Sequence, residues 1–161
     1  MWMLLTSMAF GAELTPHLSF LVGDAAELDA ETPLVVGTWS PRCDSCESTW
    51  KRLENIAERN PAVDVLAVTD DRTTWLLPHL RRLDPEFSVA VDATQRLSRN
   101  LRSGACGTGG WEELFVVVDG EVVWSGTRGL QRALARIRRG EILPTRPAGC
   151  LGLELPYRDN V

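Results

Sequence analysis

The sequence has few cysteines and no excess of basic residues, and each shortage excludes a class of protein. Only four of its 161 residues are cysteine, too few for a small secreted fold built mainly on disulfides. Its 17 basic side chains are outnumbered by 22 acidic ones, so the formal charge of -5 provides no attraction to nucleic acid or to an anionic membrane surface. With 44% apolar residues the chain can bury a core, which excludes disorder as its main state.

Long apolar runs are also missing, because none reaches the roughly 18 residues that a membrane span needs. The run at the amino terminus, residues 1–14, has the length of a signal-peptide core and ends in small residues, but no Lys or Arg precedes it. It is either the remnant of a signal sequence or a buried first element. We expect a soluble protein in the bacterial periplasm or secreted, with the cytoplasm as the alternative. Residues 15–141 then form one domain, and residues 142–161 form a carboxy-terminal tail rich in Pro and Gly.

The spacing of apolar residues predicts strands that alternate with helices. An Asp-Gly pair at 119–120 predicts a tight hairpin turn, and Gly140 is placed to cap the last helix. This order of elements predicts an α/β fold, a mixed sheet with helices on both faces. The expected strands are 33–39, 63–68, 87–91, 114–118 and 121–124. The expected helices are one that contains Cys46 and is ended by Asn60-Pro61, then 73–83, 93–101 and about 128–139.

Two cysteines, Cys43 and Cys46, lie between a predicted strand and a predicted amphipathic helix. A cysteine is a useful nucleophile only as a thiolate, and the amino terminus of a helix stabilises that anion. We therefore expect Cys43 to attack a disulfide and Cys46 to resolve the mixed disulfide. Arg42 should favour the thiolate, and Asp44 should oppose it. A purely structural disulfide, or two inert buried thiols, remains an alternative.

Other bound groups are not indicated. A zinc site needs four ligands, but Cys106 and Cys150 are single and far apart, and His17 and His79 have no ligand spacing. The glycine-rich residues 107–110 lead into a predicted strand rather than a helix, so they do not form a dinucleotide fingerprint. We predict no cofactor and no metal, since a dithiol itself carries the electrons.

The pattern Trp-x-x-x-Cys-x-x-Cys from Trp39 to Cys46, with the later hairpin Phe-Val-Val-Val-Asp-Gly-Glu-Val-Val, resembles the thioredoxin-like fold. Within that fold the chain is similar to the TlpA/ResA/CcmG-like thiol-disulfide oxidoreductases of bacterial envelopes, over roughly residues 18–140. The resemblance implies an extra helix-strand insertion before the closing hairpin. It also implies that Trp39 packs beneath the redox pair and that the partners are protein thiols or disulfides.

Two departures from that family concern the site. The family has a cis-proline just before the hairpin strand, but this chain has no proline between Pro85 and Pro144. Trp111, Glu112 or Glu113 should occupy that position, with a trans peptide bond, because a cis bond before a non-proline residue costs about 2.5–4 kcal/mol.

The second departure is Gly37, which stands where thioredoxins hold a buried acid that assists proton transfer. Glu112 or Glu113 would be a replacement carboxylate near the sulfurs, or else a solvated pair at the start of a strand. Both departures leave a second function open. In that alternative the fold is a non-catalytic binding module that holds a soft metal ion through Cys43 and Cys46.

The remaining cysteines are Cys106, in the glycine-rich loop, and Cys150, in the tail. A disulfide between them would pin the tail to the domain in an oxidising compartment. Cys106 could instead serve as an extra redox partner for Cys43.

Overall fold

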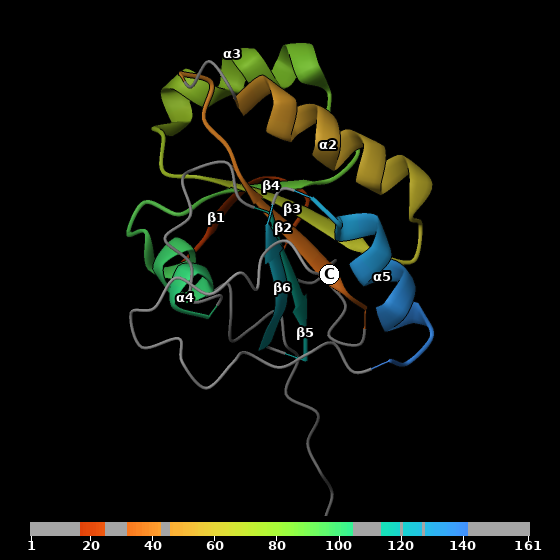
Figure 1. The fold of residues 1–161 in the computed structure, drawn as a ribbon. Helices are drawn as coiled ribbons and strands as arrows, with labels where there is room; N and C mark the ends of the chain where they lie inside the picture. The colour runs from red at the N-terminus through yellow and green to blue at the C-terminus, as the bar shows by residue number, and fades with distance from the viewer. Residues whose placement is uncertain are drawn as a thin grey trace, which may run out of the picture.

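The structure is a computed structural model of the chain, and it describes residues 17–24, 32–42, 46–104, 114–119, 121–126 and 128–141. Within these residues six strands form one mixed sheet in the order β1-β4-β3-β2-β5-β6 (Figure 1). The predicted mixed α/β architecture is therefore confirmed. The strands are β1 (Ser19–Val22), β2 (Leu34–Thr38), β3 (Asp64–Thr69), β4 (Ser88–Val91), β5 (Leu114–Val118) and β6 (Glu121–Gly126).

The centre of the sheet is parallel and its edges are antiparallel. β2 pairs with β3, and β3 with β4, in parallel register. β1 runs antiparallel to β4, and β5 runs antiparallel to both β2 and β6. Every residue of β2 and of β4 is buried, as expected for strands that are covered on both faces. Because β2, β3 and β4 are parallel, their carboxyl ends lie together at one end of the strands.

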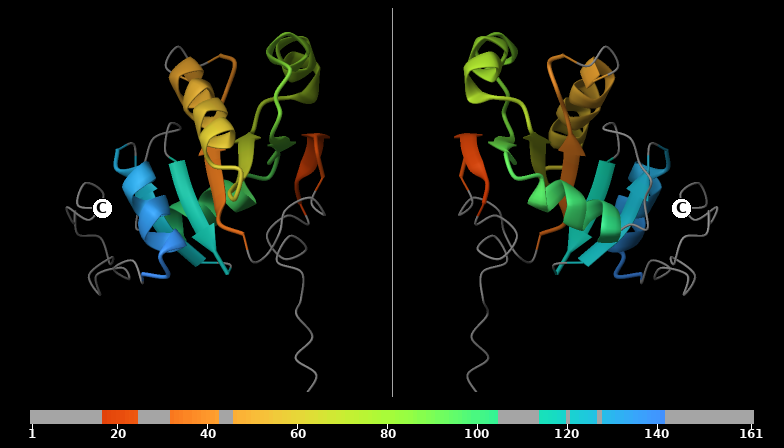
Figure 2. Two further views of the ribbon diagram at one scale, coloured as in Figure 1. Left: turned by 90° about the vertical axis from the view of Figure 1, so that its right-hand side faces the viewer. Right: turned by 90° about the vertical axis from the view of Figure 1, so that its left-hand side faces the viewer.

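Helices cover both faces of the sheet. Side chains of α2, α3 and α5 belong to one buried cluster, and side chains of α4 belong to the cluster on the other face. Figure 2 shows α4 on the side of the sheet opposite α2 and α5. The helices are α2 (Cys46–Arg59), α3 (Thr73–Leu83), α4 (Arg96–Gly104) and α5 (Leu130–Arg138). Because β3, α3, β4 and α4 stand between α2 and the hairpin, the expected extra helix-strand insertion is present.

Most predicted elements agree with the structure to within one or two residues. α3 has the predicted bounds, and Gly140 follows α5 in the left-handed conformation with φ of 70°, as expected for a capping glycine. In the hairpin Val118 pairs with Glu121, and Asp119 has φ of 49°, in agreement with the predicted two-residue turn. No helix among the described residues is long and apolar enough to span a membrane.

Two elements differ from the prediction. β1 was not expected, and its four residues become a strand by pairing with β4. α4 begins three residues later than predicted because Asp92 organises the connection before it. The Asp92 carboxylate accepts hydrogen bonds from the backbone N–H groups of Arg96 and Ser98, at 3.0 and 2.9 Å, which fixes the start of the helix.

Candidate functional site

The predicted redox turn lies between the end of β2 and the start of α2. The described residues include 39–42 and continue from Cys46, which is the first residue of α2. Cys43 and Asp44, and the side chain of Cys46, lie outside the described residues, so their roles stay predictions. The strand and the helix on either side of the turn stand where the sequence predicted them.

Trp39 continues the parallel pairing of β2 beyond its last residue. Its backbone N–H donates a hydrogen bond of 2.9 Å to the carbonyl of Val68 in β3. Its side chain is buried and lies against Trp50 of α2, with ring centroids 4.6 Å apart. Trp50 in turn contacts Phe87, with centroids 5.1 Å apart. These contacts hold the first half of α2 against the sheet beside the redox turn.

A buried carboxylate, Asp71, lies beside the same turn. Asp71 follows β3 by two residues, and the parallel pairing places the carboxyl ends of β2 and β3 side by side. It is 2% exposed. Its Oδ2 accepts a hydrogen bond from the hydroxyl of Ser40, and its Oδ1 forms an ion pair with the guanidinium of Arg42. Its own backbone N–H donates to Thr69 Oγ1 at 3.1 Å.

Arg42 connects this buried carboxylate to the surface of the protein. Its side chain is 65% exposed, and its guanidinium carbon lies 5.6 Å from the ring centroid of Trp75 in α3. Trp75 is itself 57% exposed. The residue that directly precedes Cys43 is therefore held from two sides, by a charge beneath it and by an aromatic ring beside it.

The sequence reasoning identified Trp39 and Arg42 but missed Ser40, Asp71 and Trp75. A signal for Asp71 was available, since two acidic residues, Asp70 and Asp71, directly follow a predicted buried strand. A carboxylate at the carboxyl end of a strand next to the redox turn is well placed to act on it. Arg42 was expected to favour the Cys43 thiolate through its positive charge, but that charge is paired with the Asp71 carboxylate.

The space around Gly37 is too small for a larger side chain unless its neighbours shift. A Cβ atom there would lie 2.9 Å from both methyl carbons of Leu53 and 3.0 Å from a methyl carbon of Leu114. Both leucines are almost fully buried, so neither can move aside without opening the core. Gly37 is therefore packed closely between α2 and β5.

Several predicted site residues lie outside the described part of the chain, so their roles stay predictions. Glu112, Glu113, Cys106 and Cys150 lie outside it, as do Trp111 and the peptide bonds at the position of the family's cis-proline. No group of three potential metal ligands occurs among the residues that the structure describes.

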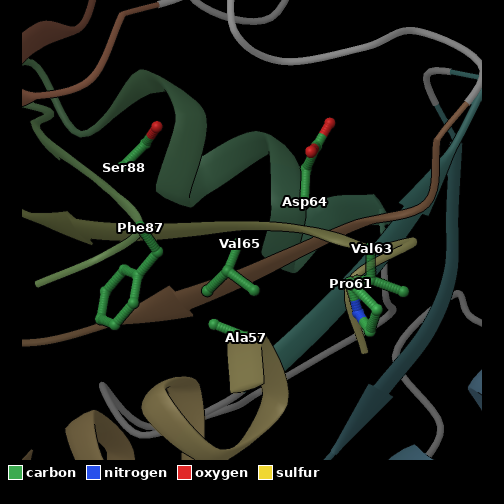
Figure 3. Close-up of a pocket in the computed structure, with 7 residues that line it drawn as sticks. All are labelled: Ala57, Pro61, Val63, Asp64, Val65, Phe87 and Ser88. Carbon is green, nitrogen blue, oxygen red and sulfur yellow. The ribbon is translucent and has the colours of Figure 1, made fainter. Parts of the chain in front are cut away.

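A separate depression of about 230 Å³ lies at the opposite end of the strands, where β3 and β4 begin (Figure 3). Five of its seven lining residues are apolar, and the other two carry the Asp64 carboxylate and the Ser88 hydroxyl. The lining residues are Ala57, Pro61, Val63, Asp64, Val65, Phe87 and Ser88. The turn that leads into the Cys-x-x-Cys motif lies at the other end of these strands, where Arg42 pairs with Asp71.

No family model and no curated protein matches the sequence. Among the solved structures that are similar to this one are the following three. A bacterioferritin comigratory protein of Xanthomonas campestris, described for alkyl peroxide reduction, is 15% identical with a TM-score of 0.57, over 76% of this chain and 88% of that one. An exposed lipoprotein thioredoxin of Streptococcus pneumoniae is 16% identical with a TM-score of 0.55, over 68% and 86%. A thioredoxin-like protein of Porphyromonas gingivalis is 18% identical with a TM-score of 0.53, over 76% and 86%.

Proposed function

We propose that this chain, which has the thioredoxin-like fold, is a thiol-disulfide oxidoreductase that exchanges a Cys43/Cys46 dithiol with disulfides or thiols of partner proteins. The observation that carries the proposal is the position of the Cys-x-x-Cys motif in this fold. The motif follows β2 in the sequence, and its second cysteine is the first residue of α2. The motif resembles that of the TlpA/ResA/CcmG-like oxidoreductases.

The proposed exchange has two steps. The Cys43 thiolate attacks one sulfur of the partner's disulfide, which forms a mixed disulfide and releases the other partner sulfur as a thiolate that takes a proton from water. Cys46, as a thiolate, then attacks Cys43 Sγ and releases the second partner thiol. Two electrons pass from the dithiol to the partner, and the pair ends as a Cys43–Cys46 disulfide. The reverse sequence oxidises a partner dithiol.

Two features of the described residues support this reaction. The amino terminus of α2 carries the positive end of the helix dipole, which stabilises a nearby thiolate. The buried contact of Trp39 with Trp50 holds that helix end in place against the sheet. The proposed location, the periplasm or the exterior of the cell, is oxidising and would supply partner proteins with disulfides.

A redox titration of the purified protein tests the proposal. We expect one two-electron couple in the wild type that is lost in both Cys43→Ser and Cys46→Ser. Cys46→Ser should accumulate mixed disulfides through Cys43, whereas Cys43→Ser should not. A wild type with no dithiol-disulfide couple that binds Cu(I) or zinc stoichiometrically would contradict exchange and favour the non-catalytic binding module.

We also propose that Cys106 and Cys150 form a second disulfide that ties the tail to the domain. The proposal follows from the presence of two cysteines outside the Cys-x-x-Cys motif and from the oxidising compartment proposed above. Peptide mapping without reductant should yield a linked pair of peptides that contain these residues. The recovery of both residues as free thiols from oxidised protein would refute it.

A further inference from the structure

We infer that Asp71 is a positioning residue for the proposed exchange, because it holds Arg42 beside the redox turn and neutralises the charge of that arginine. The Cys43 thiolate is then stabilised less than it would be by an arginine without an acidic partner. The inference rests on the proposed function of the Cys43/Cys46 pair. It concerns a residue that neither the motif nor the family resemblance assigns to the site.

The geometry points to Asp71 because its contacts converge on the segment that leads into Cys43. One carboxylate oxygen accepts from the Ser40 hydroxyl, and the other pairs with the Arg42 guanidinium. The same hydroxyl of Ser40 also accepts a hydrogen bond of 3.2 Å from the backbone N–H of Arg42. A single buried carboxylate thus fixes both the side chain and the backbone of the residue before Cys43.

The pairing also determines the charge that the thiol experiences. Arg42 and Cys43 are consecutive, so their Cα atoms are about 3.8 Å apart. A positive charge on a neighbouring residue lowers the pKa of a thiol, and an ion pair of zero net charge does so far less. A carboxylate that is 2% exposed is shielded from bulk water, so its effect on the thiol is screened less than that of a surface charge.

The other charged groups nearby have different partners or positions. Asp70 accepts a hydrogen bond of 2.7 Å from Gln95, in the connection after β4. Arg72, which follows Asp71, is exposed at the start of α3. Asp44 adjoins Cys43 in the sequence and lies outside the described residues. Among the described residues, Arg42 is the cation that contacts the Asp71 carboxylate.

This electrostatic role predicts shifts of opposite sign in two variants. Asp71→Asn keeps an oxygen that can accept hydrogen bonds but removes the negative charge, so the pKa of Cys43 should fall by about 1 unit. Arg42→Ala leaves the buried carboxylate without its cation, so the pKa of Cys43 should rise by about 1 unit. The double variant restores a neutral environment and should return close to the wild-type value.

The test measures the rate of alkylation of Cys43 by iodoacetamide against pH in the reduced protein, with mass spectrometry to identify the modified residue. Arg42→Lys retains the charge and should keep the pKa near that of the wild type. Asp119→Asn makes the same chemical change in the exposed hairpin turn, at the other end of the sheet, and should have no effect. Far-ultraviolet circular dichroism establishes that each variant is folded.

The outcomes separate this inference from the proposed function. A wild type with no redox couple at Cys43 and Cys46 defeats the proposed function. A wild type with a couple, but with unchanged pKa values or with shifts of the same sign in Asp71→Asn and Arg42→Ala, defeats only the inference. Shifts of the same sign are the result expected if Asp71 merely keeps the turn folded.

Discussion

Trp39 at the end of β2 packs against Trp50 of α2, with ring centroids 4.6 Å apart and ring planes inclined by 51°. These two residues bracket Cys43 and Cys46 in the sequence, so the contact closes the segment that carries the proposed redox pair. Both indoles are buried, and the second also donates a hydrogen bond of 2.7 Å to Glu54 one turn further along the helix. The position of the helix end therefore depends on an aromatic contact within the core.

This contact should be measurable as a coupling free energy. We expect Trp39→Leu and Trp50→Leu each to lower the free energy of unfolding, and the double variant to lose less than the sum by about 0.5–1.5 kcal/mol. Urea unfolding of the four proteins measures the coupling. Trp75→Leu is the matched control, because that ring is 57% exposed and its loss should cost less than about 1 kcal/mol. Additive losses at Trp39 and Trp50 would contradict the prediction.

The packing around Gly37 leads to a second prediction. We expect Gly37→Ala to lower the free energy of unfolding by about 1–3 kcal/mol, because the added methyl group would overlap Leu53 and Leu114. Gly37→Asp should cost more, since it adds a charge in a buried strand without a partner. Chemical denaturation of both variants measures the losses.

The control for Gly37 combines two changes. Leu53→Ala alone should destabilise the protein by leaving a cavity, but Gly37→Ala with Leu53→Ala should cost less than the sum of the single losses. A tolerated Gly37→Asp that restored a titrating buried acid would show instead that the site can accept the family's residue.

Much of the fold could be predicted from the sequence because its signals are local. The apolar run of β2, the helical spacing of α3 and the Asp-Gly turn each depend on a few neighbouring residues, and each agrees with the structure. β1 was missed because four residues carry too little periodicity, and pairing with β4 makes it a strand. α4 was placed too early because the side chain of Asp92, rather than apolar spacing, determines where it begins.

The candidate site, too, could be predicted from the sequence only where its signals are local. The cysteine spacing and Trp39 could be recognised from one short motif, whereas Asp71 joins the site from almost thirty residues further along the chain. Its contact with Arg42 depends on the parallel pairing of β2 and β3, which no local pattern contains. The sequence pattern instead pointed to Glu112 and Glu113, at the position of the missing proline, as replacement acids.

The capping role of Asp92 can be tested through stability. Its buried carboxylate accepts the backbone N–H groups of Arg96 and Ser98 and also the Ser98 hydroxyl, at 2.9–3.0 Å. Asp92→Ala should lower the free energy of unfolding by about 1–3 kcal/mol, because it leaves the helix start without acceptors. Asp92→Asn should lose less. Asp84→Asn, at an exposed residue with φ of 45°, is the matched control and should change stability by less than about 0.5 kcal/mol.

The first turn of α2 contains an ion pair next to the redox motif. Lys51 Nζ lies 2.8 Å from Glu47 Oε1, one helical turn apart. The hydrogen bond to Lys51, followed by the charge of Lys51, lowers the pKa of Glu47 below its ordinary value of 4.5. A carboxyl whose pKa is lowered on folding contributes stability that is present above its unfolded pKa and lost as the pH falls through its folded pKa.

The pH dependence of this pair should be visible by NMR. The side-chain carbonyl carbon of Glu47 should titrate below pH 4.5 in the wild type, and Lys51→Ala should move that midpoint upward. High salt should reduce the difference, because both side chains are exposed and their attraction is screened. The negative charge at the helix amino terminus also interacts favourably with the helix dipole, so part of the lowered pKa should survive the substitution. A midpoint that Lys51→Ala leaves unchanged would show that Lys51 is not the cause of the lowered pKa.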